Sequence, residues 1–318
     1  MIRLNDIVVK FGDFTALHNI NVHVQEGEFF TFLGPSGCGK TTTLRMIAGL
    51  ETPTSGRITI GDQVVFDSAL GINVPANKRK VGFLFQNPDR QICCGTVREE
   101  LLFGFKALDE LDAQAEQRVD AIIERFGFDP DADPFLLNRG ARQLLALASI
   151  VVLEPPVVVL DEPTTGLDFR ECVKVMQVIS QLHRAGTTVV MVCHDMEVVA
   201  DFAERVIVMS EGRVVDQGPT FEVLRNPRTL EEAHLVPPQI VDISLALPLM
   251  DAHLAASPVA AADTLNEMQA AVEAMAGRAP VGCFVLEEAA ERLQGAPGPQ
   301  ELQPPAAPVP CDSKEVLR

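Results

Sequence analysis

The residues with the clearest chemical purpose are 34–41, which read GPSGCGKT and have the spacing G-x-x-x-x-G-K-T. Glycines in such a loop let successive backbone N–H groups turn inward around phosphate oxygens. Lys40 can reach the β- and γ-phosphates, and the Thr41 hydroxyl can ligate Mg²⁺. The pattern predicts that the chain binds a nucleoside triphosphate. The residues that we expect around the nucleotide are Gly34, Pro35, Ser36, Gly37, Cys38, Gly39, Lys40, Thr41 and Thr42.

A pair of adjacent carboxylates, Asp161 and Glu162, follows the apolar run 157–160. A carboxylate at the end of a strand can hold Mg²⁺, directly or through water. A second carboxylate beside it can polarise an attacking water. The pair therefore predicts a metal ligand and a catalytic base for phosphate chemistry.

The elements around these residues have the right character to position them. The apolar stretch 28–33 precedes the glycine-rich loop, and a helix-like stretch, residues 42–49, follows it, so the loop opens a helix whose dipole favours anions. The β-branched runs 157–160 and 188–192 are typical of strands buried on both faces. The helical segment 171–185 lies between them, which predicts a βαβ unit with parallel strands.

The rest of the chain to about residue 238 reads as further short strands and helices. Alternating apolar and polar residues over 2–33 predict antiparallel strands, and the segment 56–66 predicts a hairpin that turns at Gly61-Asp62. Further expected elements are a strand over 81–85, helical segments over 96–127 and 144–152, and a hairpin over 205–216 around Glu211-Gly212.

Composition excludes several classes of partner. The net charge of −18 argues against nucleic acid and against an anionic membrane surface as electrostatic partners. No apolar run is long enough to span a bilayer, and the first six residues lack the apolar core of a signal peptide, so we expect a cytosolic protein.

The seven cysteines show no C-x-x-C pair or metal-ligand spacing, and the adjacent Cys93 and Cys94 suit neither a zinc site nor an ordinary disulfide.

The composition changes after residue 238, where alanine and proline become frequent. We therefore expect a nucleotide-binding domain over 1–238 and a C-terminal extension over 239–318. In the extension, residues 264–276 and 284–294 have helical character, and the proline-rich stretch 295–310 has the composition of a disordered segment.

The string LDEPTTGLD at residues 160–168, taken with the glycine-rich loop, resembles the ATP-binding-cassette (ABC) ATPases of transporters. The resemblance covers about residues 1–225. It implies an α/β P-loop NTPase fold with a mixed β core, an antiparallel β subdomain and an α-helical subdomain over about 95–150. It also implies the cofactors ATP and Mg²⁺.

The resemblance assigns roles to individual positions. Gln86 matches the glutamine that contacts Mg²⁺ and the attacking water, and His194 matches the histidine that holds the γ-phosphate. With Lys40 and the base Glu162 they form the implied catalytic set, while Thr41, Gln86 and Asp161 form the implied metal set. Asp168 closes the loop 165–168, which in the family crosses to a second subunit. Phe11 matches the aromatic that stacks on adenine, and a plain core phenylalanine is the alternative.

One motif departs from the family pattern. The signature is usually L-S-G-G-Q, but here residues 137–143 read LNRGARQ. Asn138 replaces the serine that binds the γ-phosphate across the dimer, and Arg139 replaces a glycine, whereas Gly140 is retained. Asn138 and Gly140 are still expected to contact nucleotide. The changes leave open a nucleotide-gated subunit with weak hydrolysis as an alternative to a full ATPase.

Two branches of the family are visible in the motifs. The loop 35–44 and the stretch 73–79 resemble ATPases of sulfate, iron or polyamine importers. The segments 86–91 (QNPDRQ), 193–200 (CHDMEVVA) and 237–240 (PPQI) resemble energy-coupling-factor importers of vitamins and transition metals, which we favour because these motifs are rarer.

The resemblance implies membrane subunits, a second ATPase subunit, identical or different, and a place on the cytoplasmic face of the membrane. A GTPase is disfavoured because no N-K-x-D motif is present, and a soluble ABC ATPase acting on DNA or ribosomes is disfavoured because no coiled-coil insertion or tandem cassette is present.

Overall fold

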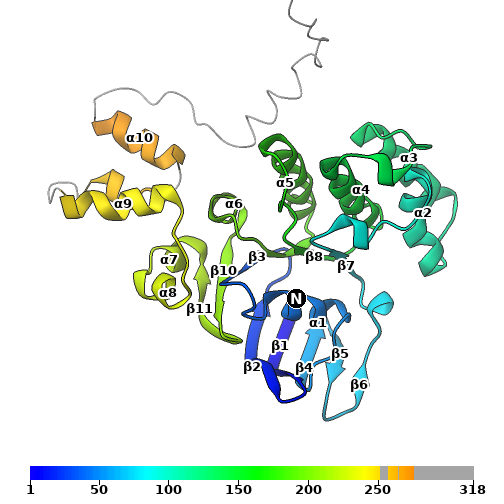
Figure 1. Cartoon of the computed structure of the whole chain (residues 1–318), viewed down its shortest axis with the longest axis horizontal. Coiled ribbons are helices and arrows are strands. Elements are labelled where there is room, and N and C mark those ends of the chain that lie inside the picture. The colour runs from blue at the N-terminus through cyan, green and yellow to red at the C-terminus, as the bar shows by residue number, and fades with distance from the viewer. Residues whose placement is uncertain (251–256, 264, 276–318) are drawn as a thin grey trace, which may run out of the picture.

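The computed structural model of the chain describes residues 1–250, 257–263 and 265–275 (Figure 1). The expected helix over 284–294 and the proline-rich stretch 295–310 lie outside the described residues. Two sheets and a set of helices make up the body of the molecule. This arrangement confirms the α/β fold class with an antiparallel sheet and helical elements.

The N-terminal sheet is antiparallel and has the strand order β2-β1-β4-β5-β6. Its strands are β1 (Ile2–Phe11), β2 (Phe14–Val24), β4 (Ser55–Ile60), β5 (Gln63–Asp67) and β6 (Ile72–Asn73). The hairpin expected over 56–66 is confirmed, with Ile60 opposite Gln63 at the turn.

The second sheet is mixed and has the strand order β11-β10-β3-β9-β8-β7. Its strands are β3 (Phe29–Leu33), β7 (Val81–Leu84), β8 (Val157–Asp161), β9 (Thr188–Val192), β10 (Arg205–Ser210) and β11 (Arg213–Pro219). β11 pairs antiparallel with β10, and the other neighbours are parallel. The βαβ unit formed by β8, α5 (Phe169–Arg184) and β9 and the hairpin around Glu211-Gly212 are therefore confirmed.

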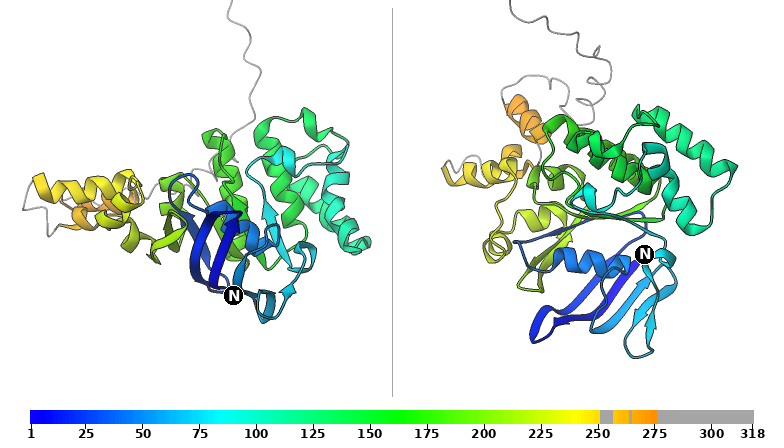
Figure 2. Two further views of the ribbon diagram at one scale, coloured as in Figure 1. Left: turned by 60° about the horizontal axis from the view of Figure 1, so that its bottom comes forward. Right: turned by 45° about the vertical axis from the view of Figure 1, so that its right-hand side comes forward.

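The helices cover the mixed sheet from both sides. The α-helices are α1 (Lys40–Ala48), α2 (Val97–Leu108), α3 (Ala113–Phe126), α4 (Arg139–Val151), α5 (Phe169–Arg184), α6 (Met196–Phe202), α7 (Thr220–Leu224), α8 (Pro227–Glu232), α9 (Gln239–Met250) and α10 (Leu265–Met275). Short 3-10 turns lie at Ala76–Lys78, Pro88–Arg90, Pro134–Leu136 and Pro258–Ala261. Figure 2 shows α9 and α10 at the opposite end of the molecule from α2 and α3.

Alternate side chains of the central strands enter two cores. Val157 and Val159 of β8 pack toward α1 and the antiparallel sheet, whereas Val158 and Leu160 pack toward the helices α2 to α6. All four are fully buried. This two-sided burial is why the run carries no polar alternation, and it places α1 between the two sheets.

Several boundaries differ from the sequence prediction. The helical stretch 96–127 is two helices, because Asp109 adopts a left-handed φ of 62° and ends α2. The helix expected from Leu144 begins at Arg139 instead, since Asn138 caps it with its side-chain oxygen. The altered signature therefore lies at the start of α4 rather than in a loop.

The C-terminal elements are tied to the body by polar contacts. The Arg225 guanidinium donates to Asp263 Oδ1 at 2.6 Å and to Ser244 Oγ at 3.1 Å. The backbone N–H of Gln239, at the start of α9, donates to Glu197 Oε1 at 2.8 Å.

The helix expected over 264–276 is confirmed as α10, whereas α6 to α9 had not been predicted. Over the residues that the structure describes, no helix combines the length and the hydropathy needed to span a bilayer.

Candidate active site

The glycine-rich loop connects β3 with α1 and can be built only with glycine at key positions. Gly34 has φ 139°, and a Cβ there would lie 2.0 Å from the carbonyl oxygen of Met209. Gly39 has φ 103°, and its Cβ would lie 2.3 Å from Leu17 Cδ2. Both φ values lie where residues with a Cβ are strained. The loop backbone is thus packed tightly between β2 and β10.

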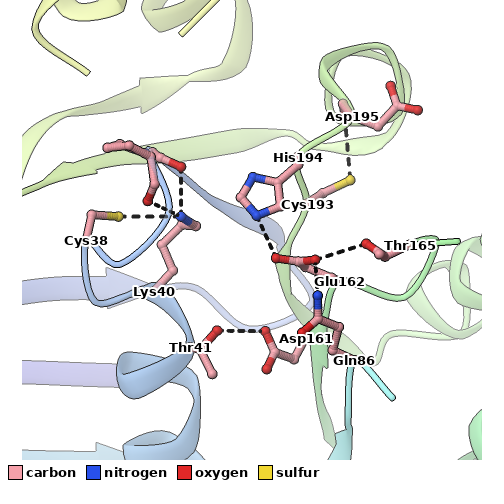
Figure 3. A network of polar contacts seen from close by, with 12 residues as sticks. Cys38, Lys40, Thr41, Gln86, Asp161, Glu162, Thr165, Cys193, His194 and Asp195 are labelled. Atoms are coloured by element: carbon pink, nitrogen blue, oxygen red, sulfur yellow. Dashed lines mark hydrogen bonds and ion pairs between the residues drawn. The ribbon is translucent and has the colours of Figure 1, made fainter. Parts of the chain in front are cut away.

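Lys40 reaches back across this loop from the first position of α1. Its side chain is buried, and its ammonium donates to the carbonyl oxygens of Gly34 at 2.7 Å and Pro35 at 2.8 Å (Figure 3). Cys38 Sγ lies 3.5 Å from the same nitrogen. The Lys40 ammonium therefore lies at the centre of the loop, where it could pair with the phosphates of a bound triphosphate.

Thr41 and Asp161 form a corner of oxygen ligands beside the loop. The Thr41 hydroxyl donates to Asp161 Oδ1 at 3.0 Å. Burial raises the pKa of the Asp161 carboxyl, the Thr41 hydrogen bond lowers it, and the neighbouring Glu162 charge raises it further. Because Mg²⁺ prefers hard oxygen donors and its charge would relieve a buried carboxylate, this donor set fits the ion.

We expect Asp161→Asn to reverse its effect on stability when Mg-ATP is added. An acid whose pKa is higher in the folded than in the unfolded state makes the fold less stable as the pH rises through that range. The neutral amide removes this cost, so without nucleotide the variant should melt above the wild type at pH 7. With Mg-ATP the order should invert, because the variant has lost a metal ligand. Differential scanning calorimetry in both conditions measures this, and a variant that still melts above the wild type with Mg-ATP would contradict the metal assignment.

Glu162 is held by three donors directly after β8. Its φ is 52°, in the left-handed region that non-glycine residues adopt at a cost of about 1–2 kcal/mol. Gln86 Nε2 and His194 Nε2 each lie 2.5 Å from its carboxylate oxygens, and Thr165 Oγ1 donates at 3.0 Å (Figure 3). The carboxylate is thereby fixed in orientation while lone pairs remain for the proton of a water.

Strand order explains why these groups meet. The parallel strands β3, β9, β8 and β7 are neighbours and end at the same edge of the sheet. The P-loop follows β3, His194 follows β9, Asp161 and Glu162 end and follow β8, and Gln86 follows β7. One edge of the sheet therefore brings together the glycine-rich loop, the Thr41–Asp161 pair and the oriented carboxylate of Glu162.

The remaining expected site residues lie elsewhere. Asn138 Oδ1 accepts from the N–H of Ala141 at 2.7 Å and caps α4, and Asp168 caps α5 by accepting from Glu171 at 2.8 Å. Gly140 packs against Glu171, since a Cβ there would lie 2.1 Å from its carboxyl carbon. Phe11 is 50% exposed, so the alternative of a plain core phenylalanine is wrong.

Two contacts in this region were not predicted from the sequence. Thr165 holds Glu162 through its hydroxyl, and Arg139 donates to the Thr165 carbonyl oxygen at 3.0 Å. The proline at position 163 could have predicted the Thr165 contact, because a turn after Pro163 brings the chain back toward the carboxylate of Glu162. No sequence signal predicts that Arg139 folds onto the loop of its own subunit.

Comparison with known proteins adds an independent line of support. The family model of ABC transporters matches residues 17–165. The energy-coupling factor transporter ATP-binding protein EcfA of Methanothermobacter thermautotrophicus is 35% identical over 247 residues, which cover 76% of this chain and 78% of that protein. EcfA2 of Clostridium perfringens is 36% identical over 230 residues, which cover 71% and 80%.

Solved structures agree. The chain resembles cbiO1 of Clostridium perfringens, described as part of the ABC transporter complex cbiONQ, with TM-score 0.63, 30% identity and coverage of 78% of this chain and 96% of that one. It also resembles an ATP-binding cassette in a dimeric post-hydrolysis state bound to ADP and Pi, with TM-score 0.59, 30% identity and coverage of 69% and 99%. An ABC transporter ATP-binding protein of Methanosarcina mazei is 40% identical over 234 residues, and this match spans 39% of its length.

Proposed function

Because this chain belongs to the family of ABC transporter ATP-binding proteins, we propose that it binds and hydrolyses ATP to power a membrane importer. The observation that carries the proposal is the carboxylate of Glu162, held by Gln86, His194 and Thr165 beside the Thr41–Asp161 corner. A site that only bound nucleotide would have no need of a carboxylate oriented by three donors.

The chain's own residues divide the work. The P-loop backbone and Lys40 bind the phosphates. On binding, Lys40 exchanges its hydrogen bonds to the carbonyl oxygens of Gly34 and Pro35 for hydrogen bonds to phosphate oxygens. Thr41, Asp161 and Gln86 would hold Mg²⁺, which when bound neutralises charge between the β- and γ-phosphates. Glu162 accepts the proton of the water whose oxygen attacks phosphorus, as the bond from phosphorus to the bridging oxygen breaks. His194 donates to the γ-phosphate oxygens as charge shifts toward ADP.

Each ATP site needs a second subunit. One cassette surrounds the triphosphate from the loop side and leaves the γ-phosphate facing outward, so the segment 138–143 of a second ATPase subunit would close over it. Splitting of ATP then removes the bridging phosphate, and the two cassettes separate. We propose Phe11 as the stacking partner of adenine, since half of its surface is accessible.

For the transporter class, we favour an energy-coupling-factor importer of a vitamin or a metal ion. The support is the similarity to EcfA proteins and to cbiO1, together with the motifs at 86–91 and 193–200. Gln86 and the segment 87–105 would receive a helix of the membrane subunit on the cytoplasmic face. An importer of sulfate, iron or polyamine is the second candidate, favoured by the sequence of residues 35–44.

The decisive experiment measures phosphate release by the purified full-length chain, alone and with co-purified membrane subunits. Mg-ATP-dependent release that rises with the membrane subunits is expected. ATP binding without release in either preparation would favour the nucleotide-gated alternative. Mass spectrometry of the co-purified subunits, with uptake assays for vitamins and metal ions, would decide between the two importer classes.

We expect Asn138→Ser combined with Arg139→Gly to raise the hydrolysis rate of a homodimer about tenfold, equivalent to ~1.4 kcal/mol of transition-state stabilisation. Serine caps helices as well as asparagine does, so α4 should stay folded. Glycine frees the Thr165 carbonyl and opens the approach to nucleotide. The control is Arg139→Lys, which keeps the charge and should leave the rate near that of the wild type. An unchanged rate in the double variant would mean that the altered signature is competent as it stands.

A further inference from the structure

We propose that Cys93, Cys94 and Glu100 form a binding site for a thiophilic divalent cation such as Zn²⁺. The site lies in the turn that joins the Pro88–Arg90 3-10 helix to α2. One ligand atom from each of the three residues lies within 4.8 Å of the other two. The proposal does not depend on ATP hydrolysis, and it differs from the sequence-based expectation, which considers the two adjacent thiols without the carboxylate.

Glu100 is the centre of the site. It is only 3% exposed and lies in the first turn of α2. Its Oε2 accepts the backbone N–H groups of both Cys93 and Cys94 at 2.9 Å. These two hydrogen bonds hold the cysteine backbones over the carboxylate, and one ligand atom of each of the three side chains lies within 4.8 Å of the other two. The ligand atoms of the three side chains therefore lie close enough together to hold one cation.

The turn is fixed on both sides, so binding costs little ordering entropy. On one side Gln91 donates to the carbonyl oxygen of Ala146 at 2.7 Å and to Ser149 Oγ at 3.1 Å. On the other side Thr96 caps α2 by accepting from the N–H of Glu99 at 3.2 Å. A ligand set held in this way is preorganised.

The donor chemistry selects the ion. Two sulfurs and one carboxylate oxygen suit Zn²⁺, Cd²⁺ or Co²⁺ in a tetrahedral site, whereas Mg²⁺ prefers oxygen alone. The exposed Cys93 leaves the fourth position open to water. Burial, together with the neighbouring Glu100 and Cys93, raises the pKa of the Cys94 thiol above its ordinary value. Binding of the cation releases the thiol protons to solvent, as it does in structural zinc sites.

The test titrates Cd²⁺ into the reduced full-length protein and follows the ultraviolet charge-transfer band of cadmium–thiolate bonds. The chain has no tryptophan or tyrosine, so its own ultraviolet absorption is weak, and the difference spectrum against the metal-free protein gives the band. We expect saturation at one equivalent, reversal by excess Zn²⁺ and a higher melting temperature with either ion. The variants C93S and C94S should each lose at least half of the band and bind at least tenfold more weakly. The matched control C172S should keep both band and affinity.

A band of wild-type strength in the double variant C93S/C94S would overturn the site, since the remaining cysteines would then supply the sulfur. Absence of any band in the wild type would overturn it as well. E100Q should weaken Cd²⁺ binding at least tenfold, and unchanged affinity in a folded E100Q would remove Glu100 from the ligand set. Should E100Q misfold, the two cysteine variants, whose side chains are at least partly exposed, still decide the question.

Discussion

Glu162→Gln will leave Mg-ATP binding within a few-fold of the wild type and lower the turnover by about 100-fold or more, the range typical of a lost general base. The amide keeps the shape of the side chain and can still meet Thr165, but it cannot take a proton from water. Gln86 and His194 lose a charged acceptor, yet neither holds the P-loop. Single-turnover phosphate release and calorimetric titration with ATP measure the two effects separately.

The matched control for this variant is Glu124→Gln, an exposed glutamate on α3 that makes the same chemical change away from the site. Its turnover should equal that of the wild type. If Glu162→Gln turned over at the wild-type rate, Glu162 would not be the base, and the three donors around it would have to be explained as a structural contact.

Lys40→Ala should weaken ATP binding by about 10- to 100-fold, because a hydrogen bond to a charged group contributes about 1.5–3 kcal/mol. The substitution removes the positive charge that faces the phosphates and leaves the Gly34 and Pro35 carbonyls without their donor. Isothermal titration calorimetry with Mg-ATP gives the affinity, and circular dichroism checks that α1 remains folded.

Lys106→Ala serves as the control, since Lys106 is exposed in the last turn of α2. Binding of ATP to this variant should be unchanged. Full affinity in Lys40→Ala would contradict the phosphate site itself, and with it the roles given to Thr41 and Asp161. A folded wild-type chain that gave no heat with Mg-ATP at millimolar concentration would have the same consequence.

The sequence by itself determined the phosphate loop, the carboxylate pair and the family. These features are contiguous strings, such as 34–41 and 160–168, in which local backbone requirements and chemistry fall on the same residues. The buried strands of the mixed sheet were also predictable, because burial on both faces imposes uniformly apolar runs. The ends of the helices were less predictable. The cap at Asn138 and the left-handed φ of Asp109 depend on single local hydrogen bonds and dihedral angles, which hydrophobic periodicity does not detect.

Only the tertiary structure decided how distant residues combine. Arg139 meets the Thr165 carbonyl, and Glu100 is placed under the backbone N–H groups of Cys93 and Cys94. Such contacts depend on the direction in which a side chain leaves its helix and on the turn that packs against it. Both are set by the packing of α2 and α4 on the sheet, which involves residues far apart in the chain. A linear pattern shows which groups are available, and packing determines which of them meet.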